Sequence, residues 1–201
     1  MKSTAFVKSA LFGVLLSLPF AVDANASNMT TLGLTSQPIG HYDFCRVYPK
    51  ECNVRSRKSK PMTLTEASWN TILRINYSVN RAIRPQTDEE MFGVEERWSF
   101  PKDVGDCEDY VLLKRHMLMR AGFKPSDLLI TVVRQLDGSG HAVLTVRTDR
   151  GDFILDNMRD KVLLWSETEY TFLKRQSSLH TGKWKKLQHS SSTLVGSIKE
   201  N

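Results

Sequence analysis

The 201-residue chain carries 28 Lys and Arg residues against 22 Asp and Glu residues, a formal net charge of +6. This length suits one domain with a hydrophobic core, and the small positive excess, without a Lys/Arg block, argues against a nucleic-acid-binding protein. Weak attraction to anionic envelope surfaces is the interaction that this charge leaves open.

The first 26 residues have the pattern of a secretory signal peptide. Lys2 and Lys8 flank the start, an apolar run extends from Ala10 to Ala21, and Ala24-Asn25-Ala26 is a small-x-small cleavage site. A membrane anchor is the alternative, but the apolar run is shorter than the roughly 20 residues that span a bilayer. We therefore predict cleavage after Ala26 and a periplasmic or secreted mature protein.

The mature chain is expected to form one domain over residues 27–187, followed by a polar tail over residues 188–201. Residues 27–40 are polar and are predicted to lie loosely over this domain. The next segment contains two of the three cysteines, Cys45 and Cys52, at a spacing that suits a short-loop disulfide in an oxidising compartment. A zinc site that adds His41 to these cysteines is the alternative, although the spacing matches no common ligand pattern.

A first helix is predicted from the capping-box sequence Thr63-Leu64-Thr65-Glu66 up to Pro85, because apolar residues recur at helical spacing over this stretch. Residues 86–104 form a long connection that contains Asp88-Glu89-Glu90 and Trp98. Connections of this length without regular structure are often functional.

A second helix is predicted to start at Cys107, with Asp106 as its N-cap, and to end at Gly122. Five strands are then predicted from β-branched and aromatic runs, at residues 128–133, 141–148, 153–156, 162–165 and 170–176. Helices followed by a run of antiparallel strands give an α+β fold.

Cys107, His141 and Asp156 are the candidate catalytic residues. A cysteine in the first turn of a helix lies where unpaired N–H groups and the helix dipole favour a thiolate. His141 opens one predicted strand and Asp156 closes the next, and a two-residue loop between these strands would place both side chains on the same sheet face. A cysteine, a histidine and an aspartate can form a thiol-protease triad. The alternatives are a buried apolar Cys107 and a structural His141.

The acidic neighbours of Cys107, which are Asp106, Glu108 and Asp109, repel one another and would raise the pKa of the thiol. A bound cation would remove this penalty, and Ca²⁺ prefers several oxygen ligands. These three residues are therefore candidate calcium ligands. Capping of the helix N-terminus without a metal is the alternative. For the oxyanion of a reaction intermediate, the Cys107 backbone N–H is one expected donor, with Trp98, Asn80 or Gln86 as candidates for the second.

Several motifs together form a signature: His41-x-x-Phe44-Cys45 with Pro49 and Cys52, Trp98, Gly105-Asp106-Cys107-Glu108-Asp109-Tyr110, Gly140-His141-Ala142-Val143-Leu144, Leu155-Asp156-Asn157 and Phe172-Leu173-Lys174-Arg175-Gln176. On these motifs the chain resembles the bacterial transglutaminase-like cysteine proteinases, among them the periplasmic calcium-dependent proteases that release biofilm adhesins. The resemblance runs from about His41 to Trp184 and implies a papain-like, transglutaminase-type core. It also implies Cys107 as nucleophile, His141 as base, Asp156 as the residue that orients the base, an adhesin substrate and an inner-membrane regulatory partner.

The predicted function is a cysteine endopeptidase that acts on an extended segment of a surface or envelope protein. Two alternatives use the same residues differently. A glutamine acyl transferase or deamidase would share the triad and the thioester chemistry. A catalytically silent module would use calcium only to tune contact with a membrane partner.

Overall fold

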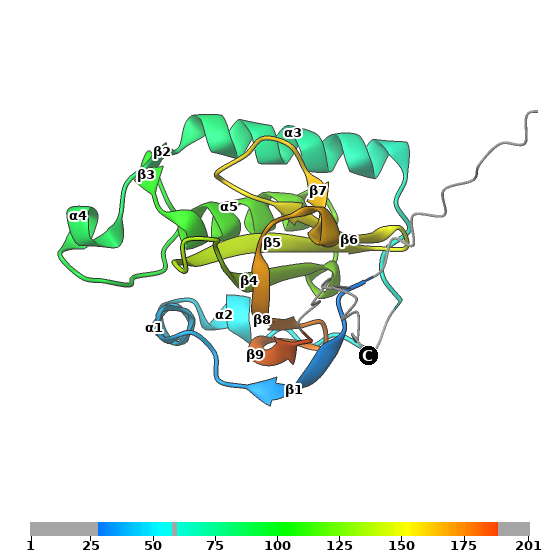
Figure 1. The fold of residues 1–201 in the computed structure, drawn as a ribbon, viewed down its shortest axis with the longest axis horizontal. Helices are drawn as coiled ribbons and strands as arrows, with labels where there is room; N and C mark the ends of the chain where they lie inside the picture. Colours follow the sequence, from blue (N-terminus) through cyan, green and yellow to red (C-terminus); the bar gives the residue numbers. More distant parts are fainter. Residues whose placement is uncertain (1–27, 58–59, 189–201) are drawn as a thin grey trace, which may run out of the picture.

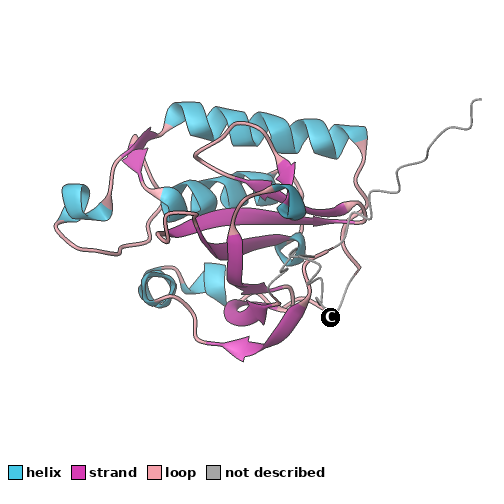
Figure 2. Cartoon of the chain, viewed as in Figure 1, coloured by secondary structure: helices cyan, strands magenta, loops and turns pink. Residues whose placement is uncertain are grey.

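The computed structural model describes residues 28–57 and 60–188. The helices are α1 Ile39–Val47, α2 Pro49–Cys52, α3 Glu66–Ala82, α4 Asp88–Phe92 and α5 Cys107–Arg120 (Figure 2). The strands are β1 Thr31–Thr35, β2 Arg84–Pro85, β3 Val104–Gly105, β4 Leu128–Arg134, β5 Gly140–Thr148, β6 Gly151–Leu155, β7 Leu163–Leu164, β8 Thr171–Ser177 and β9 His180–Leu187. The predicted signal peptide and the tail after residue 188 lie outside the described residues.

Seven strands form one antiparallel sheet in the order β1-β9-β8-β4-β5-β6-β7, and β2 and β3 form a separate parallel pair. Helix α5 packs on β5 and β4, and α3 packs on α5, so the two long helices cover one part of one sheet face (Figure 1). The predicted α+β fold is confirmed. Among the described residues, no helix has the length and apolar character needed to cross a membrane.

The structure differs from the local predictions in several places. Part of the stretch 27–40, predicted to lie loosely, forms β1, which pairs with β9 at the edge of the sheet. The cysteine segment contains the short helices α1 and α2, and β9 had no predicted counterpart. The N-cap of α3 is Thr65, not Thr63, because Thr65 and Ser68 exchange the two hydrogen bonds of the capping box, and the helix begins at Glu66.

The disulfide between Cys45 and Cys52 joins α1 to α2 and rules out the zinc alternative, since both sulfurs are bonded to each other. His41 is buried beside it and accepts a hydrogen bond from Trp184 Nε1 at its Nδ1 (3.2 Å). The rings of Trp98 and Trp184 each lie 5.3 Å from the His41 ring. The N-terminal helices are thereby held against Trp98, a residue of the long connection before α5.

The β5–β6 hairpin sets the register that the candidate triad needs. Thr148 pairs with Gly151, so the loop holds only Asp149 and Arg150, and Leu144 pairs with Leu155. Gly151 adopts φ 107°, a backbone conformation that residues other than glycine rarely adopt. The two-residue loop was the condition under which Asp156, which follows Leu155, shares a sheet face with His141.

We predict that His41 makes stability fall in acid. Burial, followed by the charge of Arg115, lowers the pKa of His41 from 6.5 to about 4. The neutral imidazole is therefore favoured by folding, and its contribution is complete above pH 6.5 and is lost as the pH falls from 6.5 to 4. The loss is about 3 kcal/mol from 1.36 kcal/mol per pKa unit.

The measurement is the free energy of unfolding by denaturant at pH 4 to 7. The variant His41→Gln should be less stable than the parent at pH 7 and should show a flatter dependence on pH. The partly exposed His116 provides the control His116→Gln, which should keep the parental slope. Equal slopes in the parent and in His41→Gln would contradict the prediction.

Candidate active site

A cavity of about 370 Å³ opens where α5 begins beside the start of β5. Cys107 and His141 both line it, together with Trp98 and Glu96 from the connection before β3. Its other lining residues are Pro38, Ile39, Glu108, Val132, Gly140, Ala142 and Lys174. The structure thus brings the candidate nucleophile and the candidate base into one cleft.

Cys107 is the first residue of α5 and is partly exposed. Its thiol donates to Glu108 Oε2 at 3.3 Å. Burial, then the charge of Glu108 and a weaker effect of Asp106, raise the pKa of the thiol, while a hydrogen bond from the Ala142 backbone lowers it. Asp106 occupies the N-cap position as predicted, but its side chain makes no capping hydrogen bond. The carboxylates therefore oppose the helix dipole.

His141 Nε2 lies 3.0 Å from Asp156 Oδ1, and both side chains are buried. Tyr170 donates its hydroxyl to Asp156 Oδ2 (2.6 Å), and the Met158 N–H donates to Oδ1 (3.0 Å). Burial alone would raise the pKa of Asp156, but the hydrogen bonds from His141, Tyr170 and Met158 outweigh it and lower the pKa to about 2. Asp156 is therefore an anion that fixes the imidazole by its Nε2 side.

The three candidates for a second oxyanion donor lie in different places. Trp98 lines the cleft, where its Nε1 donates to Glu96 Oε1 (2.7 Å). Asn80 instead donates to the backbone carbonyls of Asp156 (3.0 Å) and Arg159 (3.2 Å), and so supports the turn that carries Asp156. Gln86 lines a separate cavity.

Asp88, Asp106 and Glu108 form an acidic cluster in which one ligand atom from each lies within 4.8 Å of the others. Oδ1 of Asp88 and Oδ1 of Asp106 are buried and have no hydrogen-bond partner among the described residues. Burial, followed by contact with Asp106, raises the pKa of Glu108 to about 10. Buried carboxylate oxygens that converge without donors are the ligand set that a hard cation such as Ca²⁺ requires.

Asp109, the third predicted ligand, lies outside this cluster. Its Oδ1 accepts from the Ser99 N–H at 2.8 Å, so it anchors the long connection to α5. Asp88 takes its place and was missed by the sequence reasoning. The run Asp88-Glu89-Glu90 was a visible signal, but only the fold shows that α4 brings Asp88, and not its neighbours, to Cys107's helix.

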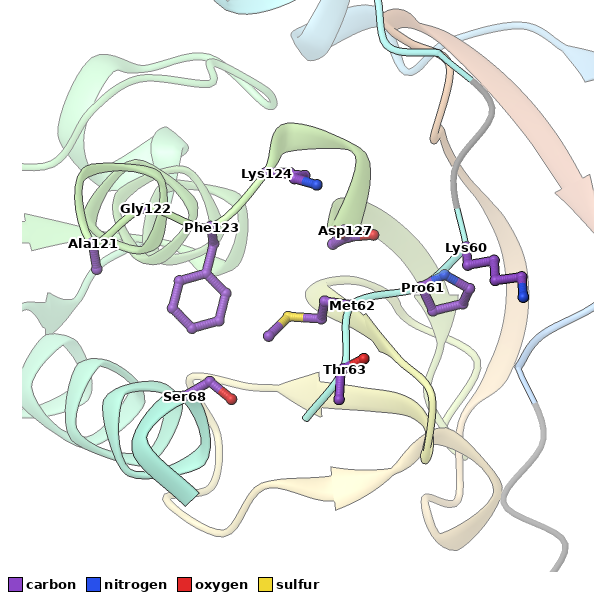
Figure 3. Close-up of a pocket in the computed structure, with 10 residues that line it drawn as sticks. All are labelled: Lys60, Pro61, Met62, Thr63, Ser68, Ala121, Gly122, Phe123, Lys124 and Asp127. Carbon is purple, nitrogen blue, oxygen red and sulfur yellow. The ribbon is translucent and has the colours of Figure 1, made fainter. Parts of the chain in front are cut away.

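A second cavity, of about 450 Å³, lies at the other end of α5 (Figure 3). Phe123 and Met62 face it, and its charged lining residues are Lys60, Lys124 and Asp127. Neither a cysteine nor a histidine lines it. The pair formed by Cys107 and His141 in the cleft at the start of α5 therefore has no counterpart in this cavity.

Three similar solved structures are of LapG from Legionella pneumophila. One is 24% identical, with a TM-score of 0.50 over 59% of this chain and 68% of that chain. A calcium-bound LapG is 23% identical (TM-score 0.51; 63% and 75%), and an EGTA-treated LapG is 23% identical (TM-score 0.50; 63% and 74%). At this level of identity the likeness shows the fold alone.

No curated protein sequence matches the chain. Residues 31–192, however, match the sequence profile of the bacterial transglutaminase-like cysteine proteinases, BTLCP. This match spans most of the 201 residues. The protein therefore belongs to the bacterial transglutaminase-like cysteine proteinases and is a cysteine peptidase of that type.

Proposed function

We propose that this peptidase is a periplasmic endopeptidase that cleaves an extended segment of a surface or envelope protein, such as a biofilm adhesin. The observation that carries the proposal is the shared cleft, in which Cys107 at the start of α5 meets the His141–Asp156 pair. The signal-peptide pattern and the Cys45–Cys52 disulfide support an oxidising compartment outside the cytoplasm. An inner-membrane regulatory protein is the further partner that this location allows.

In this mechanism Cys107 is the nucleophile, His141 the base and acid, and Asp156 the residue that orients the imidazole. Because Asp156 holds Nε2, Nδ1 of His141 is the nitrogen that takes the thiol proton. The Cys107 sulfur bonds to the scissile carbonyl carbon, and the C–N bond breaks as His141 returns the proton to the leaving amine. His141 then takes a proton from water as the water oxygen bonds to the acyl carbon. The C–S bond breaks, the acyl group leaves as a carboxylic acid, and His141 returns the proton to the Cys107 sulfur. The Cys107 backbone N–H is one oxyanion donor.

We also propose that Asp88, Asp106 and Glu108 hold a calcium ion. The unpartnered oxygens of Asp88 and Asp106 and the raised pKa of Glu108 support this assignment, since a divalent cation would neutralise carboxylates that are otherwise buried together. When bound, the ion would offset the negative charge beside the thiol. One LapG structure is calcium-bound and another EGTA-treated, so calcium binding is compatible with this fold.

Cells that carry Cys107→Ala should fail to process an envelope protein that wild-type cells cleave. N-terminal sequencing of envelope proteins from both strains measures this directly. A second measurement is the rate at which iodoacetamide alkylates Cys107 in the purified protein. This rate should fall in His141→Ala, because the base that removes the thiol proton is lost. Ammonia release without a new N-terminus would instead favour a glutamine acyl transferase or deamidase. Identical envelope N-termini in the two strains would contradict the proposal.

Asp156→Asn should lower kcat by up to roughly four orders of magnitude, because a neutral amide does not stabilise the imidazolium and can turn its NH₂ group towards the ring, which favours the wrong tautomer. Tyr170→Phe should cost less, roughly 10- to 100-fold, because one hydrogen bond to a charged group contributes about 1.5–3 kcal/mol. Tyr77→Phe is the matched control, since Tyr77 is 53% exposed on α3. Initial rates on the substrate found above provide the measurement, and a folded Asp156→Ala protein that keeps the parental kcat would exclude the assigned role.

Calcium at 100 times its dissociation constant should stabilise the folded protein by about 2.7 kcal/mol relative to EGTA. Asp88→Asn should abolish this difference, whereas Glu89→Gln, a change of the same size at an exposed neighbour on α4, should keep it. Denaturant unfolding with calcium, with magnesium and with EGTA is the measurement. A calcium effect that survives Asp88→Asn but not Asp109→Asn would place the ion on the sequence-predicted ligands instead.

A further inference from the structure

A row of directly paired residues crosses the sheet from the cleft towards its β1 edge. Ala142 of β5 pairs with Val132 of β4, Val132 with Lys174 of β8, and Lys174 with Lys186 of β9. Directly paired residues project from the same face of a sheet. Ala142, Val132 and Lys174 line the cleft with Cys107, so Lys186 continues the floor of that cleft outwards.

A second hollow, of about 590 Å³, follows the first and shares Lys174 with it. Leu32, Leu173 and Leu187 are its apolar lining residues, and Lys174 and Lys186 supply its charge. The segment from Leu32 to Ile39 borders both hollows, and its side chains Leu32 and Ile39 are 49% and 67% exposed. The two hollows meet at Lys174, and together they are called the groove below.

The two lysines are an unfavourable pair within the protein alone. Like charges that lie directly opposite on antiparallel strands repel each other and destabilise the sheet. Neither Lys174 nor Lys186 forms an ion pair with another residue of the described ranges. The Lys174 ammonium donates to the Ser36 carbonyl at 3.1 Å and is influenced by Glu96, whereas Lys186 is exposed. An anionic ligand would relieve this repulsion.

We infer that this groove binds an acidic, extended segment of the protein substrate on one side of the scissile bond. This inference rests on the proposed endopeptidase function and adds the chemical class of its substrate. An aliphatic side chain of the substrate packs on Leu32 and Leu173, and a carboxylate lies between Lys174 and Lys186. Continuity with the cleft and the charge of the paired lysines select a polypeptide carboxylate as the occupant.

The test uses an amine-blocked library of peptides from a chymotryptic digest of a bacterial proteome. The full mature protein is incubated with this library, and new N-termini are sequenced by mass spectrometry, with Cys107→Ala as the blank. Cleaved peptides should be enriched in Asp or Glu at a fixed distance on one side of the cut. A charge series at one position, Lys186→Met and Lys186→Glu, should lower kcat/KM for an acidic peptide two- to fivefold per unit of charge, a rough figure for exposed ion pairs.

Lys183→Glu is the matched control, because Lys183 is exposed on the same strand but three residues from Lys186, on the opposite face. It should leave the preference unchanged, and added salt should weaken the preference in the parent. Cleavage without acidic enrichment, or equal effects of Lys183→Glu and Lys186→Glu, would overturn the inference and leave the proposed function intact.

Two other results would also overturn the inference that the groove binds an acidic segment of the substrate. No cleavage beyond the Cys107→Ala blank would remove the proposed function and this inference with it. Lys186→Glu that releases the protein from phosphatidylserine vesicles without altering the cleavage preference would assign the lysines to a lipid surface and overturn the inference.

Discussion

The buried carboxylate of Asp156 is the interaction on which the rest of the site depends. A buried anion costs several kcal/mol unless hydrogen bonds replace its water. Here the replacements come from His141 on β5, from the Met158 N–H in the following turn and from Tyr170 just before β8. The two-residue hairpin loop and the turn held by Asn80 must both form before these donors converge. The contacts that stabilise the buried Asp156 carboxylate therefore also fix the orientation of the His141 imidazole.

The thiol is placed under two opposing influences. The start of α5 favours a thiolate at Cys107, whereas burial and the neighbouring carboxylates of Glu108 and Asp106 favour the neutral thiol. The pKa of Glu108 is raised to about 10, so Glu108 is protonated at neutral pH and does not add a third negative charge to the cluster with Asp88 and Asp106. Under the proposed mechanism, a cation at this cluster makes nucleophile chemistry and ion binding thermodynamically linked.

Local patterns in the sequence were sufficient to predict those elements whose structure is set by their own segment of the chain. The positions of α3 and α5 and of strands β4 to β6 follow from periodicity, and the shared face of His141 and Asp156 follows from the register. Edge strands gave weaker signals. The two leucines of β1 are exposed, and β9 has three lysines, two of them adjacent, without a regular alternation, so the pairing of the two strands with each other decides both.

The acidic cluster shows why part of the site could not be predicted from the sequence. Asp106 and Glu108 are neighbours of Cys107 in sequence, but Asp88 arrives from α4 at the end of a connection whose path is fixed by tertiary contacts. Two of these contacts are the hydrogen bonds from the Arg97 N–H to Asp88 and from the Ser99 N–H to Asp109. A prediction from spacing alone chooses Asp109 because it is close in sequence, whereas the fold uses it to hold the connection.

Lys174 and Lys186 lie on one side of the thiol, along the floor that leads to β1, and under the inference above this asymmetry gives a substrate a direction. A peptide with a carboxylate on one side of the scissile bond meets the lysines in one orientation and loses this attraction in the reverse orientation. Electrostatic complementarity of this kind contributes more to specificity than to affinity, because it makes the two orientations differ in free energy.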